Sequence, residues 1–363
     1  MRKRIRTSAW ARALQRQFVA LTRLATAAGK KALAKAPKRA AARPKPRSEA
    51  GAWIPGVAIG TTGTIGAMGA MGARRFRLFR PPGIQPGERL PLLVMLHGCG
   101  QDAAGFAAST RMNRVALRER FCVLYPEQDR LANAQGCWNW FETDSGRAYG
   151  EVALIMKAID QVCLLHPVDR SQVAVAGLSA GASLAALMVT RHPGRFQALV
   201  MHSGVPPGTA HSTLSALGAM HGRRPTAPLL ASPGAMAADW PPLLVIHGSA
   251  DGVVSPRNGQ AAVQLWVQAA GAKAGAARRV QRGKRYPMCV TDYQRGGRTV
   301  ATQIEVQGLA HAWSGGAATQ PFSDARGPDA SRIVWAFAAR QFKASGALEH
   351  GRLASAPRRA MAR

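Results

Sequence analysis

The sequence lacks any long uninterrupted run of apolar residues. No stretch approaches the roughly 20 apolar residues that cross a bilayer, and uncharged runs near the start, such as residues 17–22, are too short for the core of a secretory signal. We therefore expect no transmembrane segment, no signal peptide and a cytoplasmic location. Cysteine is also scarce, because five cysteines in 363 residues, an odd number, do not predict a disulfide scaffold.

The motifs that usually hold catalytic zinc are missing as well. The chain contains neither an HExxH motif nor a pair of CxxC motifs, which are common spacings for histidine and cysteine ligands. We therefore expect no metal and no cofactor. Aromatic residues make up only 6% of the chain, so a local cluster of them stands out.

Acidic residues are few, with 18 Asp and Glu against 49 Lys and Arg. The imbalance is greatest at the N-terminus, where residues 1–47 hold 15 basic residues and no acidic one. Apolar residues recur with a helical period between residues 8 and 29, which predicts a basic amphipathic helix. Residues 8–47 then suit an anionic or apolar surface, or nonspecific binding to nucleic acid. A helix that packs on the folded domain or stays mobile is an equally good interpretation.

Composition divides the chain into four parts. Residues 1–50 form a basic extension, in which the Ala-, Lys- and Pro-rich second half is expected to be disordered. Residues 51–72 are rich in glycine and are interpreted as a linker or a loosely docked strand. Residues 73–345 form one folded domain, and residues 346–363 form a basic tail.

The folded part alternates apolar runs with helical patterns, which predicts a mostly parallel sheet flanked by helices. An alternating segment at residues 73–80 predicts an edge strand. A later pair of alternating segments, separated by Gly296 and Gly297, predicts a strand pair. Runs typical of strands buried on both faces occupy residues 91–97, 121–125, 173–176, 198–201 and 243–247.

The buried run at residues 173–176 leads into Gly177-Leu178-Ser179-Ala180-Gly181, and a helical pattern follows. A tight turn between a strand and a helix lifts a serine hydroxyl above the sheet, where a histidine can reach it. The pentapeptide alone is weak evidence, but this strand and helix context makes Ser179 the candidate nucleophile. The backbone N–H of Ala180, at the start of the helix, is then suited to an oxyanion.

Asp251 and His311 each follow a predicted strand, as Ser179 does. Functional loops of parallel sheets lie beyond the carboxyl ends of the strands, and the order Ser, Asp, His is that of α/β-hydrolases. We therefore predict an α/β-hydrolase fold with a catalytic triad of these three residues. The amide of Cys99, in the glycine turn after residues 91–97, is the predicted second oxyanion donor. The other histidines, including His202 and His247, are interpreted as structural.

Several segments resemble the polyhydroxybutyrate depolymerase family of esterases: LPLLVMLHGCGQDA, GCWNWF, AVAGLSAGASLAALM, VIHGSADGVV and GLAHAWSGG. The resemblance implies hydrolysis of ester bonds in poly(3-hydroxybutyrate) or its oligomers. It makes Trp138, Trp140 and Trp313 candidates for the wall of an apolar subsite. Secreted relatives can pair cysteines matching Cys99 and Cys137, whereas in a reducing cytoplasm we expect free thiols here.

The resemblance also suggests that the basic N-terminus holds the enzyme on polyester storage granules. Deletion of residues 1–47 tests this hypothesis, since unchanged granule attachment would refute it. Two other functions remain open. One is a general carboxylesterase acting on small or plant-derived esters, because substrate choice lies in the loops. The other is a granule- or nucleoid-binding protein whose hydrolase domain is inactive.

Overall fold

The structure is a computed structural model that describes residues 51–60, 72–226 and 240–355. The segments predicted to be an amphipathic helix and to be disordered, residues 8–47, lie outside the described residues, as does their proposed role in binding a surface or nucleic acid. Within them, no helix combines the length and the apolar character that a membrane span requires.

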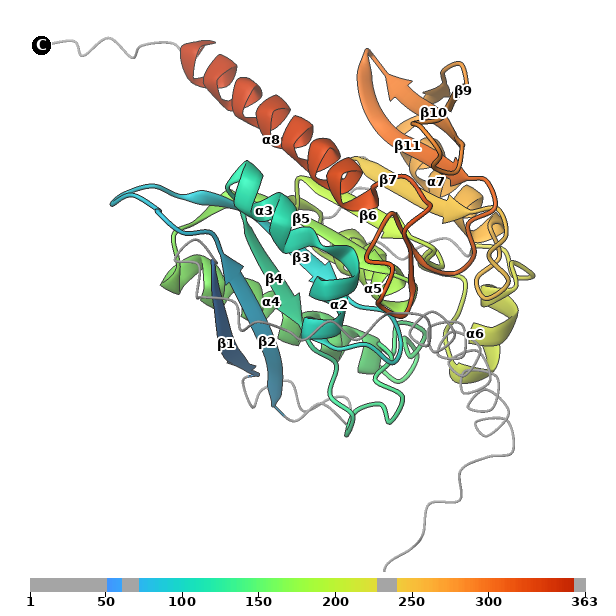
Figure 1. Ribbon diagram of the computed structural model, residues 1–363, viewed down its shortest axis with the longest axis horizontal. Helices are drawn as coiled ribbons and strands as arrows, with labels where there is room; N and C mark the ends of the chain where they lie inside the picture. The colour runs from blue at the N-terminus through green and yellow to red at the C-terminus, as the bar shows by residue number, and fades with distance from the viewer. Residues whose placement is uncertain (1–50, 61–71, 227–239, 356–363) are drawn as a thin grey trace, which may run out of the picture.

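A single large sheet runs through the folded part (Figure 1). The strand order is β1-β2-β4-β3-β5-β6-β7-β11-β10-β8, and β9 also pairs with β10. The first strands are β1 (Ala52–Ile59), β2 (Ala73–Arg80), β3 (Leu90–Leu96), β4 (Cys122–Pro126), β5 (Val168–Leu178) and β6 (Ala198–His202). The others are β7 (Leu243–Gly248), β8 (Lys273–Ala274), β9 (Arg278–Val280), β10 (Met288–Arg295) and β11 (Arg298–Val306), and β12 (Trp313–Ser314) and β13 (Ser323–Asp324) form a separate pair.

The six central strands, β4, β3, β5, β6, β7 and β11, are parallel to one another. Antiparallel strands flank them, with β1 and β2 at one edge and β10, β8 and β9 at the other. The prediction of a mostly parallel sheet is therefore confirmed, as is the strand pair β10 and β11.

The first edge of the sheet settles one open interpretation and corrects one prediction. Of the two interpretations of this segment, a linker or a docked strand, residues 52–59 form a strand, β1, which pairs with β2 along its whole length. Consequently β2 is not the edge strand, because β1 covers it. The sequence alone did not distinguish this strand from a linker, because Pro55 and Gly56 break its pattern. Proline is tolerated on an edge strand, where its missing N–H is not needed by a second neighbour.

Helices cover both faces of the sheet (Figure 1). One face is packed by α4, α5 and α7, and the other by α2, α3 and α8, so two separate groups of buried residues form the core. The helices are α2 (Ala103–Thr110), α3 (Met112–Glu119), α4 (Arg147–Leu165), α5 (Ala180–Arg191), η1 (Pro193–Arg195), α6 (Thr213–Met220), α7 (Arg257–Ala270) and α8 (Ala330–Ser355).

The alternation along β3 explains why its run is apolar throughout. Leu92, Val94 and Leu96 point to the side of the sheet that α4 and α5 cover. Leu93 and Met95 point to the opposite side, which α2 and α8 cover. Since a strand points successive side chains to opposite faces, both sets must be apolar when both faces are covered.

The last helix, α8, continues to Ser355, past residue 345, where the folded domain is predicted to end. The short helices α2, α3 and α6 were not predicted from the sequence. Each has only eight residues, too few for a helical period to be read with confidence.

Candidate active site

Ser179 occupies a strained turn between β5 and α5. Its φ of 55° and ψ of −121° lie outside the usual regions for a residue with a side chain, and such strain persists only where the surroundings enforce it. The amide of Ser179 donates to the carbonyl of His202 at 2.9 Å, which ties the turn to the end of β6.

The two glycines of the motif are required by close packing around this turn. A Cβ atom on Gly181 would lie 2.2 Å from the carbonyl oxygen of Leu96, and one on Gly177 would lie 2.4 Å from backbone atoms of Gly181. Both contacts are with backbone, which cannot move aside cheaply. The glycines therefore let α5 start directly against β3 and β5, with the serine at the apex.

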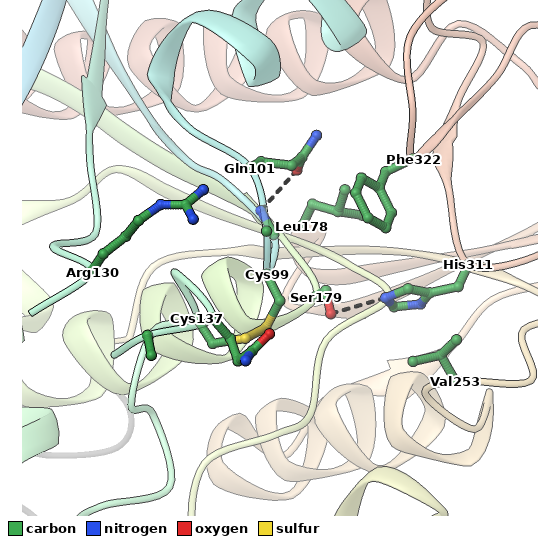
Figure 2. A pocket seen from close by; sticks show the side chains of 13 residues that line it. Cys99, Gln101, Arg130, Cys137, Leu178, Ser179, Val253, His311 and Phe322 are labelled. Carbon is green, nitrogen blue, oxygen red and sulfur yellow. Dashed lines mark hydrogen bonds between the residues drawn. A yellow bond between two sulfur atoms is a disulfide. The ribbon is translucent and has the colours of Figure 1, made fainter. Parts of the chain in front are cut away.

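The structure brings the three predicted triad residues together. The Nε2 atom of His311 lies 2.9 Å from the Ser179 hydroxyl oxygen (Figure 2). Its Nδ1 atom lies 2.8 Å from Oδ2 of Asp251. Because a carboxylate only accepts hydrogen bonds, Nδ1 carries a proton and Nε2 is left to accept the serine proton. This chain of contacts can move a proton from Ser179 to His311.

Asp251 is held in place by its own loop. Its Oδ1 atom accepts the amides of Val253 at 3.0 Å and Val254 at 2.9 Å. Burial on its own would raise the pKa of Asp251, but hydrogen bonds from His247 and His311 outweigh it and hold the pKa well below its usual range. The carboxylate is therefore ionised and fixes the orientation of the His311 ring.

Two further histidines, interpreted from the sequence as structural, are buried beside the triad. His247 lies 3.4 Å from Oδ2 of Asp251 through Nε2 and contacts the Val254 carbonyl at 2.9 Å. His202 accepts the Ser314 amide at 3.1 Å and stacks on Trp313. Burial, assisted by the nearby His247 and His311, lowers the pKa of His202 to about 3, so His202 stays neutral.

The amides of Cys99 and Ala180 are available to a substrate. Around Cys99, the amide of Gly98 donates to Gln101 Oε1 at 3.0 Å, and the amide of Gly100 donates to the Gln135 carbonyl at 3.1 Å. In the described part of the chain, the amides of Cys99 and Ala180 donate to no other residue. Two such unpaired donors near Ser179 can stabilise an oxyanion.

The peptide that carries the Cys99 amide is fixed from behind. His97 contacts the Gly98 carbonyl through Nδ1 at 2.8 Å and accepts the amide of Gln128 through Nε2 at 3.1 Å. Burial lowers the pKa of His97 to about 4, so this neutral ring donates from Nδ1. Since Gly98 C=O and Cys99 N–H belong to one planar peptide, His97 also sets the direction of that N–H.

Trp138 and Trp140 do not line the site, contrary to the prediction. The Trp138 side chain is fully buried and donates from Nε1 to the His97 carbonyl at 2.9 Å, while Trp140 is buried in the same core. Trp313 is also fully buried and donates to Ser331 Oγ at 3.1 Å. The indole N–H groups of Trp138 and Trp313 are thus satisfied inside the protein. All three side chains are buried and support the loops around the site rather than line the cavity.

The cysteine expectation is also corrected, because Cys99 and Cys137 form a disulfide. Their Cα atoms lie 4.2 Å apart across 38 residues of sequence. The bond joins the turn after β3 to the loop that precedes α4. Cys122, Cys163 and Cys289 are free.

The disulfide predicts a definite number of reactive thiols. The chain unfolded in denaturant without reductant will titrate about three thiols with a thiol reagent, and after reduction it will titrate all five cysteines. Replacement of Cys99 and Cys137 by serine will leave about three thiols in both conditions. Five thiols without reductant would show that the pair does not form.

A cavity of about 290 Å³ opens at Ser179 and His311. Its wall combines polar and apolar side chains, namely Gln101, Arg130, Gln135, Leu178, Val253 and Phe322. Leu178 and Val253 are close in sequence to the predicted residues Ser179 and Asp251. Arg130 and Phe322 lie in loops that have no recognisable motif. Within the described residues, no group of three His, Cys, Asp or Glu side chains is placed to hold a metal ion.

Two buried histidines make the stability pH-dependent. In the folded protein the pKa of His97 is about 4 and that of His202 is about 3. In an unfolded chain the pKa of a histidine is about 6.5. Between these values the unfolded chain binds more protons, so stability is full above about pH 6.5 and falls as the pH drops toward 4. Urea unfolding at a series of pH values will show this decline. His202→Asn will make it shallower, and a flat profile in the wild type would contradict the assignment.

Comparison with known proteins adds independent information. Residues 74–286 match the family model described as Esterase PHB depolymerase, a range that includes Ser179 and Asp251 and ends before His311. Over 175 residues the chain is 35% identical to Poly(3-hydroxyalkanoate) depolymerase C of Paucimonas lemoignei. The aligned region covers 46% of this chain and 42% of that protein. Over 193 residues the chain is 28% identical to Feruloyl esterase B of Neurospora crassa, covering 48% and 63%.

The chain thus spans less than two thirds of the length of these two curated relatives. Among solved structures, an acetyl xylan esterase from Aspergillus awamori matches with a TM-score of 0.50 and 18% identity, covering 66% of this chain and 89% of that one. At this identity the similarity concerns the fold alone, and it confirms the predicted α/β-hydrolase fold.

Proposed function

Because this chain belongs to the esterase PHB depolymerase family, we propose that it is a serine esterase acting on poly(3-hydroxybutyrate) or its oligomers. The observation that carries the proposal is the continuous hydrogen-bonded chain from Ser179 through His311 to Asp251. The similarity to a poly(3-hydroxyalkanoate) depolymerase over 175 residues supports the polyester as substrate.

In the first half of the reaction, the Ser179 hydroxyl oxygen attacks the ester carbonyl carbon while Nε2 of His311 takes the hydroxyl proton. The amides of Cys99 and Ala180 receive the negative charge that develops on the carbonyl oxygen. Asp251 stabilises the positively charged imidazole. When the carbon–oxygen bond to the alcohol breaks, His311 returns the proton to the leaving alcohol, and the acyl group stays on Ser179.

In the second half, a water molecule replaces the alcohol. His311 takes a proton from the water as its oxygen attacks the acyl carbon, and the same two amides hold the second oxyanion. Collapse of this intermediate releases the carboxylic acid and returns the proton to Ser179. Each oxyanion donor contributes on the order of a hundredfold in rate, so the fixed peptide behind Cys99 matters for the rate as well as for the fold.

A second candidate is a carboxylesterase acting on plant-derived or small esters. The similarity to Feruloyl esterase B favours it, and the mixed polar and apolar cavity wall accepts more than one acyl group. Both candidates use the same triad, so only the substrate separates them.

A substrate panel tests the proposal. The purified chain is incubated with amorphous poly(3-hydroxybutyrate) granules, a 3-hydroxybutyrate trimer, methyl ferulate and p-nitrophenyl butyrate, and the released acid is measured. We expect 3-hydroxybutyrate from the granules or from the trimer. Cleavage of methyl ferulate or p-nitrophenyl butyrate with no release from either polyester would overturn the polyester assignment and support the second candidate.

A further inference from the structure

Arg130 is a charged residue in the wall of the catalytic cavity. It lies in the loop after β4, and its side chain is exposed. Figure 2 shows its guanidinium on the side of the cavity that carries Gln101 and Cys99, away from His311. The proposed mechanism uses no cation at this place, so the residue needs another explanation.

In the part of the chain that the structure describes, no acidic side chain forms an ion pair with Arg130. Among the described residues that line the cavity, none is Asp or Glu, and Arg130 takes part in no ion pair or hydrogen bond of the described chain. Six arginines of the described chain form ion pairs with acidic side chains, and Arg130 is among those that do not: Arg118, Arg120, Arg170, Arg195, Arg278 and Arg326 have such partners. Arg130 is thus a cation at the mouth of the site without a counter-ion from the described protein.

The backbone that carries Arg130 is well ordered by its own contacts. Oδ1 of Asp129 accepts the Leu131 amide at 2.9 Å, and the Asp129 carbonyl accepts the Asn133 amide at 3.0 Å. Further along, the disulfide of Cys137 fastens the same loop to Cys99. The backbone of Arg130 is therefore held in place relative to Cys99, while its exposed side chain can turn toward a ligand in the cavity.

We propose that Arg130 is the counter-ion for a carboxylate on the substrate, so that the site prefers esters that carry a free acid. This inference rests on the proposed function and narrows it, because short 3-hydroxybutyrate oligomers end in a carboxylate whereas the interior of the polymer is neutral. A guanidinium binds a carboxylate through paired charged hydrogen bonds. The cavity volume of about 290 Å³, near the lower end of the roughly 300–1,000 Å³ usual for ligand pockets, suits short esters.

The test compares a 3-hydroxybutyrate trimer with a free carboxylate and the same trimer capped as its N-methyl amide. The wild type is expected to have a kcat/KM about tenfold higher for the free acid, mainly through a lower KM. Arg130→Gln will remove most of this preference and Arg130→Lys will keep part of it. Arg282→Gln, an exposed arginine of the β9–β10 connection with no place in the site, is the matched control and will retain it.

Salt gives an independent readout. Because Arg130 is exposed, raising the salt concentration to about 1 M shortens the screening length to roughly 3 Å and will reduce the wild-type preference toward that of Arg130→Gln. A wild type that cleaves both trimers equally well would overturn the proposed subsite while leaving the esterase function intact. A preference that survives unchanged in Arg130→Gln would overturn it too.

Failure of the polyester assignment is a distinct outcome. If neither the trimers nor the granules are cleaved while p-nitrophenyl butyrate is, the proposed function is wrong. The subsite is then tested with p-nitrophenyl hemisuccinate, which carries its carboxylate on the acyl group. A preference for the hemisuccinate over the butyrate that Arg130→Gln abolishes would support the carboxylate subsite. Equal rates on these two esters would refute it for either position of the acid.

Discussion

Replacing Ser179 with alanine is expected to lower kcat for ester hydrolysis by about 10⁵-fold or more. The variant keeps the oxyanion donors and the cavity but has no atom that can form the acyl-enzyme. Alanine is smaller than serine and removes only the hydrogen bond of the hydroxyl to His311, which lies at the cavity, so thermal unfolding should stay close to that of the wild type. The measurement is the steady-state rate with p-nitrophenyl butyrate, together with circular dichroism to verify the fold.

The matched control for this variant is Ser171→Ala, at the opposite end of the same strand β5. Its hydroxyl contacts only Asp169 on the surface, so the control should hydrolyse the ester at the wild-type rate. Activity of the Ser179 variant within tenfold of the wild type would place the nucleophile elsewhere in the molecule.

Asp251→Asn is expected to lower kcat by about 10⁴-fold. The asparagine oxygen can still accept the amides of Val253 and Val254, which places the side-chain NH₂ group opposite Nδ1 of His311. His311 must then leave Nδ1 without a proton and carry it on Nε2, where it can no longer accept the proton of Ser179. The loss should therefore appear in kcat far more than in KM.

Asp160→Asn is the control for this second variant. Asp160 forms surface ion pairs with Arg170 and Arg195 at the end of α4, and surface pairs of this kind contribute little to stability. Its replacement should leave kcat unchanged. If Asp251→Asn retained more than about a tenth of the wild-type kcat, then the carboxylate would not set the tautomer of His311 as described.

The central strands and the triad could be predicted because their signals are local. A run such as that of β3 is apolar at every position because helices cover both of its faces. Gly177 is required by backbone contacts with Gly181 in the same turn, and Gly181 by the backbone of Leu96 at the end of β3. Asp251 and His311 were found by a topological rule, since the carboxyl ends of parallel strands meet at one edge of the sheet.

The tryptophans and the disulfide could not be predicted in this way. The sequence of an aromatic cluster on a loop does not show whether the side chains face a cavity or the core. Only the folded structure shows that Trp138 donates a hydrogen bond to the buried carbonyl of His97. The pairing of Cys99 with Cys137 likewise depends on two loops meeting in space. Arg130 carries no sequence signal, because an arginine in a chain with 49 basic residues is unremarkable until its position in the cavity is known.

The central claim is that Ser179 is an activated nucleophile held by His311 and Asp251. Covalent labelling with diisopropyl fluorophosphate tests it most directly, because the reagent phosphorylates a serine only when its hydroxyl is activated. Intact mass and peptide mapping should show one modified residue, Ser179, with no label in Ser179→Ala and much slower labelling in Asp251→Asn. Modification of a different serine, or the same rate of labelling in Asp251→Asn as in the wild type, would contradict the account.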